Sequence, residues 1–188
     1  MRKCVIIHGT HGHSEENWFP WLKNKLESNN QYQVYIPNFP TPENQNLESW
    51  LNVLKSDFFK FDSNTILVGH SLGASFILSF LEKRNLPIKA TFLVSGFIGP
   101  IGNEKFDDLN KDFTEKEFNW EKIKNNAGKI FLYHSDNDPY VPIEKAFELA
   151  KYLSVDPIII NSAGHFNLRA GYDRFEELYN DIINLDNN

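Results

Sequence analysis

The sequence has a single cysteine, Cys4, and this scarcity excludes an internal disulfide. No hydrophobic run approaches the roughly 20 residues that a membrane-spanning helix needs, so we expect no membrane partner. Positive charge is also scarce, because 19 Lys and Arg oppose 25 Asp and Glu, and the net charge of -6 argues against a nucleic-acid partner. The apolar run at the N-terminus is too short for a signal peptide, which together with the lone thiol predicts a cytoplasmic protein.

The remaining composition is that of an ordinary folded protein. Hydrophobic residues make up 41% of the 188 positions and charged residues 23%. This is enough for one compact domain over residues 1–188 and short for two. The chain shows no internal repeat and no low-complexity linker.

Short apolar runs alternate with longer stretches whose apolar residues recur at helical spacing. Several of the runs are continuous in Val, Ile, Leu and Phe, the pattern of strands buried on both faces in a parallel sheet. The alternation predicts a three-layer α/β/α sandwich. Strands are expected at 4–8, 34–37, 65–69, 89–94, 129–134 and 157–161, and helices at 18–28, 47–58, 71–84, 143–153 and 172–185.

One segment, residues 97–128, interrupts this alternation. It is long for a crossover and rich in Asp, Glu, Lys and Phe. Long connections in compact domains are often lids or binding loops. An irregular crossover with one surface helix is an equal alternative, and Trp120 fits either role.

The stretch ILVGHSLGAS, residues 66–75, places a serine between two glycines where a buried strand meets an apolar helix. Gly-x-Ser-x-Gly in this setting is the nucleophile elbow, a sharp turn that raises Ser71 to the carboxyl edge of the sheet. Gly69 and Gly73 leave room there for the neighbouring strand and helix. A plain helix cap by Ser71 is the alternative, but the flanking strand and helix favour the nucleophile.

A serine hydroxyl is a poor nucleophile until a base takes its proton, so the elbow predicts an acid and then a histidine downstream. The fifth predicted strand runs into SDNDPYVP, which offers Asp136 and Asp138, and the last strand runs into AGHF, which offers His165. Taken singly, the two aspartates could instead form an Asx turn, and His165 could be an ordinary histidine of a surface loop. The three candidate residues follow strand ends and occur in the required chain order. They therefore predict a catalytic triad of Ser71, Asp138 and His165, with Asp136 as the second choice for the acid.

An oxyanion hole needs two N–H donors. Leu72, directly after the nucleophile, is expected to supply one, and the glycine-rich loop after the first strand supplies the other. In that loop Thr10 is the first choice and His11 the alternative.

The same loop contains a cluster of histidines, His8, His11 and His13, and histidine is the commonest metal ligand. Their spacing matches none of the zinc motifs, and only Glu15 and Glu16 stand close by. We therefore expect neither a metal nor an organic cofactor.

Aromatic residues near these motifs indicate an apolar substrate pocket, although aromatics at helical spacing are more often part of a core. The predicted pocket residues are His11, Trp18, Phe97, Trp120, Tyr140 and Phe166.

With these residues placed, the chain resembles a family of small α/β-hydrolases, the YdeN-like serine hydrolases, which are similar to the retinoblastoma-binding-protein-9 type. The resemblance covers most of the chain and is carried by HGTHGHSEENWFPWLKNKLE, PNFPTPENQNLESWL, VGHSLGAS, LVSGF, FNWEKIK, SDNDPYVP and AGHF. It implies an α/β-hydrolase fold with a very small lid and a mostly parallel sheet of about six strands in the order 2-1-3-4-5-6. It also implies the same triad.

The retinoblastoma-binding type owes its name to a Leu-x-Cys-x-Glu motif. The only cysteine of this chain lies in RKCVI, so that binding function is not carried over. The resemblance favours a carboxylesterase-like enzyme that cleaves a small-molecule acyl ester through an acyl-enzyme. A catalytically silent interaction module and a thioesterase or amidase with the same triad are the alternatives, and a monomer is slightly favoured.

Overall fold

The computed structural model describes residues 1–28, 30–55 and 60–186. Within these ranges six strands form one parallel sheet in the order β2-β1-β3-β4-β5-β6, which confirms the expected order. The strands are β1 (Arg2–Ile7), β2 (Tyr32–Tyr35), β3 (Thr65–His70), β4 (Ala90–Val94), β5 (Lys129–Ser135) and β6 (Ile158–Ile160).

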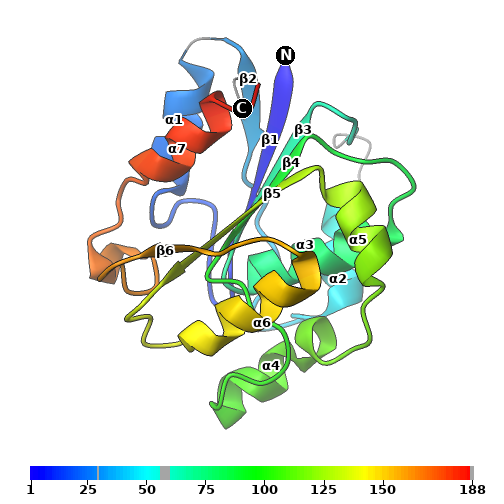
Figure 1. Ribbon diagram of the computed structural model, residues 1–188, viewed down its shortest axis with the longest axis vertical. Helices are drawn as coiled ribbons and strands as arrows, with labels where there is room; N and C mark the ends of the chain where they lie inside the picture. The colour runs from blue at the N-terminus through cyan, green and yellow to red at the C-terminus, as the bar shows by residue number, and fades with distance from the viewer. Residues whose placement is uncertain (29, 56–59, 187–188) are drawn as a thin grey trace.

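Helices cover both faces of the sheet (Figure 1), so the molecule has the expected three layers. α1 and α7 pack on one face, and α2, α3, α5 and α6 pack on the other. α4 lies at the end of the sheet where the strands terminate. In the described ranges the helices are α1 (Phe19–Glu27), α2 (Leu47–Leu54), α3 (Leu72–Lys83), α4 (Glu104–Thr114), α5 (Trp120–Ala127), α6 (Ile143–Leu153), α7 (Glu176–Ile183) and the 3-10 turn η1 (Leu168–Ala170).

The central strand β3 shows why the apolar runs lack polar alternation. Leu67 belongs to the hydrophobic cluster beneath α3, whereas Ile66 and Val68 belong to the cluster beneath α1 and α7. Successive side chains of a strand point to opposite faces, so a strand between two layers is apolar along most of its length. All six residues of β3 are buried.

Two expected helices differ from the structure by more than one residue at an end. The last helix begins at Glu176 rather than at 172, because Asn167 caps a 3-10 turn that ends at Gly171 with a φ of +84°. The helix expected over 47–58 ends at Leu54 with Lys55 as its C-cap, and residues 56–58 lie outside the described part of the chain.

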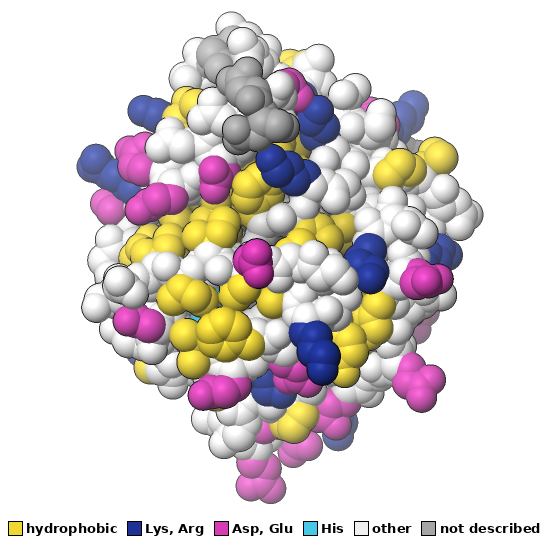
Figure 2. Space-filling model, in the orientation of Figure 1, with side chains coloured by type: hydrophobic (Ala, Val, Ile, Leu, Met, Phe, Trp, Pro, Cys, Tyr) yellow, Lys and Arg dark blue, Asp and Glu magenta, His cyan; other side chains and the backbone are white. Residues whose placement is uncertain are grey.

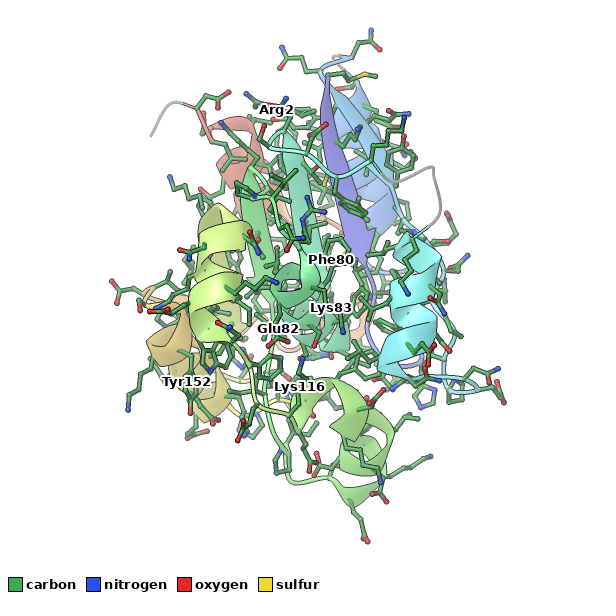
Figure 3. The ribbon with its side chains drawn as sticks, turned by 90° about the vertical axis from the view of Figure 1, so that its right-hand side faces the viewer. Arg2, Phe80, Glu82, Lys83, Lys116 and Tyr152 are labelled. Atoms are coloured by element: carbon green, nitrogen blue, oxygen red, sulfur yellow. The ribbon has the colours of Figure 1, made fainter. Side chains whose placement is uncertain are left out.

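The segment 97–128 was expected to form either a lid or an irregular crossover with one surface helix. In the structure it contains two helices, α4 and α5. α5 connects β4 to β5 and packs against α3 and α6. The stretch before it is tied to α3, because Lys116 Nζ forms an ion pair with Glu82 Oε2 at 2.5 Å (Figure 3). The backbone N–H of Asn119 donates to the other carboxylate oxygen of Glu82 at 2.7 Å. The second half of the segment is thus a crossover anchored to the body of the fold.

The surface mixes residue types. On the face shown in Figure 2, hydrophobic side chains lie among Lys, Asp and Glu. Among the described residues, the exposed large apolar side chains include Phe147 and Ile158. Among the described helices, none is long and apolar enough to cross a membrane.

Besides His165, three histidines are buried at or near the carboxyl ends of strands: His8 directly after β1, His70 at the end of β3 and His134 one residue before the end of β5. Each ring attaches a loop to the carboxyl edge of the sheet. The bonds run from Phe39 N–H to His8 Nε2 (2.9 Å), from His70 Nε2 to the carbonyl oxygen of His165 (2.8 Å) and from His134 Nε2 to that of Val141 (3.0 Å).

Burial lowers the pKa of all three rings, because the charged form loses its hydration. The pKa of His70 falls to about 3, from an ordinary value of 6.5. Between these two pH values the unfolded chain binds a proton at this position and the folded chain does not. Folding stability is therefore full above about pH 6.5 and falls as the pH decreases.

We expect the free energy of unfolding to decrease from pH 6.5 to pH 5. His70→Gln removes one group that gains a proton on unfolding, so it should lower the dependence of that free energy on pH by ~1.4 kcal/mol per pH unit. Glutamine keeps an N–H for the carbonyl of His165 but does not titrate. Urea unfolding at each pH, followed by circular dichroism, measures the slope. His134→Gln is the matched variant with the same expected direction, and an unchanged slope in His70→Gln would contradict the assignment.

Candidate active site

β3 passes into α3 through Ser71, whose φ of +55° lies in the left-handed region. A Cβ on Gly73 would stand 2.6 Å from the carbonyl oxygen of His8, and one on Gly69 would stand 2.6 Å from the backbone nitrogen of Ala74. Only glycine fits at either position, because real side chains do not approach backbone atoms so closely. The strained serine between two obligatory glycines is typical of a nucleophile elbow.

The loop after β1 passes directly over this serine. A Cβ on Gly9 would stand 2.8 Å from Ser71 Cβ and 3.3 Å from Ser71 Oγ. This close approach brings the backbone of Thr10, the next residue, to the cavity that Ser71 lines.

His165, in the loop after β6, forms a hydrogen bond with Asp138 in the loop after β5. His165 Nδ1 and Asp138 Oδ2 are 2.7 Å apart, and the Asp138 side chain is fully buried. Burial acts to raise the pKa of Asp138, but the bond to His165 and the N–H groups of Tyr140 and Val141 on Oδ1 outweigh it. The pKa of Asp138 is therefore lowered, and the carboxylate is charged at neutral pH.

Asp136, the second choice for the acid, lies elsewhere. Its side chain is exposed, and Oδ1 accepts the backbone N–H of Ser162 at 2.7 Å. Its described hydrogen bonds do not include one to His165, so this carboxylate holds the loop that carries the histidine and leaves the imidazole to Asp138.

Sequence reasoning missed Ser95 as a site residue. It follows β4, is fully buried and has a φ of +50°. Its hydroxyl lies 2.8 Å from Asp138 Oδ2, the oxygen that also faces His165 Nδ1. The sequence feature that could have identified Ser95 is the Ser-Gly pair directly after the buried apolar strand β4.

Ser71 and His165 line the same cavity, yet among the described residues no hydrogen bond joins Ser71 Oγ to His165. Hydrogen bonds between catalytic groups are commonly long without substrate and tighten when it binds. His70 also contacts His165: the two rings lie 4.8 Å apart, and His70 Nε2 bonds to the backbone carbonyl oxygen of His165.

The expected oxyanion donors differ in how they are bonded. In the described part of the chain, the backbone N–H groups of Leu72 and Thr10 form no hydrogen bond. The N–H of His11 donates to Thr41 Oγ1 at 2.8 Å. This leaves Thr10, rather than His11, with a free donor beside Ser71.

The cavity has a volume of about 490 Å³, within the range of small-molecule sites. Three of the aromatic or histidine residues expected there, His11, Phe97 and Tyr140, do line it. It also contains residues that sequence reasoning did not select: Glu16, Ile101, Phe106, Asn110, Asn167 and Arg169.

The other three expected pocket residues do not line this cavity. Trp18 and Phe166 are fully buried in the core, where Trp18 Nε1 donates to the carbonyl oxygen of Phe166 at 3.0 Å. Trp120 stacks on Tyr152 of α6 with ring centres 4.6 Å apart. Trp18 and Phe166 are therefore part of the core, because large apolar side chains fill the space between the helices and the sheet. Trp120 is partly buried and lines a different cavity, between α5 and α6.

The histidine cluster is dispersed by the fold. His8 is buried with both ring nitrogens bonded, to Phe39 N–H and to the carbonyl of Gly9, so it has no lone pair for a metal. His13 lines the cavity beside Glu16, whose pKa is raised by burial. The residues described contain no group of three or more His, Cys, Asp or Glu side chains that could hold a metal ion.

Comparison with known proteins agrees with this geometry. The chain is 33% identical over 180 residues to the hydrolase YdeN of Bacillus subtilis (strain 168), covering 95% of this chain and 93% of that protein. It is 28% identical over 166 residues to the serine hydrolase RBBP9 of Rattus norvegicus, covering 87% of each. The crystal structure of the B. subtilis ydeN product superposes with a TM-score of 0.92 over all of both chains, at 30% identity.

A family model described as serine hydrolase matches residues 4–184. The sheet order, the layers and the strand–serine–helix turn are those of the α/β-hydrolase fold. The chain therefore belongs to the serine hydrolase family of the α/β-hydrolases.

Proposed function

We propose that this hydrolase cleaves small acyl esters, as a carboxylesterase, through a triad of Ser71, His165 and Asp138. The observation that carries the proposal is the bond between His165 Nδ1 and the buried Asp138 carboxylate, at 2.7 Å, beside a cavity that Ser71 also lines. A charged acid, an imidazole and a strained serine at one sheet edge are the parts that acyl transfer needs.

In the proposed reaction Ser71 Oγ attacks the acyl carbon while His165 Nε2 takes the serine proton. Asp138 accepts the hydrogen bond from Nδ1–H, which keeps Nε2 free as the base and stabilises the imidazolium. The carbonyl oxygen becomes an oxyanion, and the free N–H groups of Leu72 and Thr10 would bind it. His165 then gives its proton to the leaving alcohol.

The second half of the reaction reverses these roles. Water gives a proton to His165 Nε2 and attacks the acyl carbon, and Ser71 Oγ leaves with the proton that His165 returns. The products are a carboxylic acid, an alcohol and the original enzyme. Each step uses side chains of this chain and water alone.

The cavity supports a small substrate. Phe97, Ile101 and Phe106 give it an apolar side, while His13, Glu16 and Arg169 bring charge or polarity to its lining. Thioesters and amides would react at the same serine, so a panel of matched esters, thioesters and amides decides the leaving group.

The first test asks whether the serine is activated. We expect a fluorophosphonate probe to label the wild type at neutral pH and to leave Ser71→Ala unlabelled. His165→Ala should be labelled at least ~100-fold more slowly, because the base is lost. Gel fluorescence or intact mass measures the labelling.

Ser28→Ala, an exposed position after α1, is the control and should be labelled like the wild type. An unlabelled wild type with intact circular dichroism would contradict the proposed activity and would favour an interaction module.

The second test distinguishes the two aspartates. Asp138→Asn should lower kcat for p-nitrophenyl butanoate by about 10⁴-fold, because the amide would donate to Nδ1 and impose the wrong tautomer. Asp136→Asn should stay within about twofold, since its carboxamide oxygen can still accept the Ser162 N–H. Steady-state kinetics measures both. Equal losses, or a loss confined to Asp136→Asn, would contradict the assignment of Asp138.

A further inference from the structure

A ring of hydrogen bonds links the loop after β1 to α4. The Thr10 hydroxyl lies 2.7 Å from Asn110 Oδ1, and Gln45 Nε2 lies 2.8 Å from the same oxygen. Gln45 Oε1 lies 2.5 Å from Thr41 Oγ1, which accepts the backbone N–H of His11 at 2.8 Å. The ring thus begins and ends at consecutive residues of the loop that passes over Ser71.

The direction of each bond in this ring follows from its two backbone members. The N–H of His11 can only donate, so Thr41 Oγ1 accepts it and turns its own hydrogen to Gln45 Oε1. The other end of that side chain is therefore the amide nitrogen, which agrees with its 3.2 Å bond to the carbonyl oxygen of Leu109. The Gln45 nitrogen donates to Asn110, so the Asn110 atom in the ring is the oxygen Oδ1.

The remaining polar atom of Asn110 is thereby an NH2 group. Asn110 lines the catalytic cavity although it is only 3% exposed. Nδ2 forms no hydrogen bond with the described residues, and it is not among the sealed, unpartnered nitrogens, which are His70 Nδ1 and His134 Nδ1. Nδ2 is therefore a donor that the cavity can reach and that no group of the described residues occupies.

The surroundings make this donor selective. Phe97, Ile101 and Phe106 line the cavity with it, and none of their side chains can accept a hydrogen bond. A ligand that covers Nδ2 with a methylene group removes its water and leaves it unpaired, which lowers affinity by about 10-fold or more. A ligand with an oxygen at that point keeps the bond. Sites of this kind reject the analogue that lacks the polar atom.

We propose that Asn110 determines substrate specificity by donating a hydrogen bond from Nδ2 to an acceptor oxygen on the unreacting part of the substrate. The preferred substrates are esters that carry an ether, hydroxyl or carbonyl oxygen near the scissile group, in preference to simple alkyl esters. This rests on the proposed esterase function and adds the substrate class.

The test uses pairs of esters that differ by one oxygen in place of one methylene. On the acyl side the pairs are p-nitrophenyl methoxyacetate with butanoate and p-nitrophenyl 3-methoxypropanoate with pentanoate. On the alcohol side the pair is 2-methoxyethyl acetate with butyl acetate. Each kcat/KM is divided by the rate of alkaline hydrolysis of the same ester, which removes the difference in intrinsic reactivity.

Asn110→Asp is the sharpest variant, because its carboxylate can keep both ring bonds at Oδ1 while an acceptor replaces the donor. Asn110→Leu removes both polar atoms. We expect the wild type to prefer the oxygen-containing ester of at least one pair, and both variants to lose that preference by about 10-fold. Gln45→Leu is the control for ring disruption and should slow both members of a pair alike.

A second readout does not need turnover. In the Ser71→Ala background, the dissociation constants of the same esters are measured by NMR titration with and without Asn110→Asp. The oxygen-containing ester should lose about 10-fold in affinity relative to its partner. If the wild type hydrolyses nothing and takes no fluorophosphonate, the esterase function fails while this comparison still tests Asn110.

Two results would overturn the role of Asn110. One is an equal oxygen-to-methylene ratio in the wild type and in both variants for every pair, in rates and in affinities. The other is a uniform loss for both members of each pair in Asn110→Asp, which would make Asn110 a positioning residue for the Thr10 loop.

Discussion

The contact between the first turn of α3 and the end of β1 is the constraint on which the site depends. Gly73 lies so close to the carbonyl oxygens of Ile7 and His8 that no side chain fits there. Because α3 starts against β1, Ser71 lies beneath the loop that leaves β1, at the place where Gly9 almost touches it. The proposed nucleophile and the proposed backbone donor for the oxyanion are thus brought together by one approach of backbone to backbone.

The proposed acid, Asp138, depends on a balance between its burial and its hydrogen bonds. A fully buried carboxylate is unfavourable unless it is paired and hydrogen-bonded. Asp138 receives bonds from its own loop, from Ser95 after β4 and from His165 after β6, so three strand ends contribute. These bonds keep the carboxylate charged and fix the imidazole ring. The same contacts therefore stabilise the loops and prepare the chemistry.

The proposed catalytic groups and the proposed substrate-binding groups come from different parts of the fold. Ser71, Asp138 and His165 follow strands of the sheet, whereas Phe106 and Asn110 come from α4, in the long connection after β4. This connection is held by the ion pair of Lys116 with Glu82 and by the hydrogen bonds around Gln45. In folds of this kind the sheet edge serves many reactions, and the inserted segment distinguishes the substrates.

The sequence by itself determined the alternation of strands and helices and the elbow, because both depend on neighbouring residues. A strand buried on two faces is apolar along most of its length, and a sharp strand-to-helix turn needs its glycines two residues before and after the serine. Only the tertiary structure shows that His165 bonds to Asp138 while Asp136 bonds to Ser162, because the two aspartates share one loop and the same chemistry and differ only in these contacts. The tertiary structure also places Trp18 and Phe166 in the core, where Trp18 Nε1 bonds to the carbonyl oxygen of Phe166, 148 positions away. The ring around Asn110 joins loops separated by up to 100 positions, and no local pattern encodes such contacts.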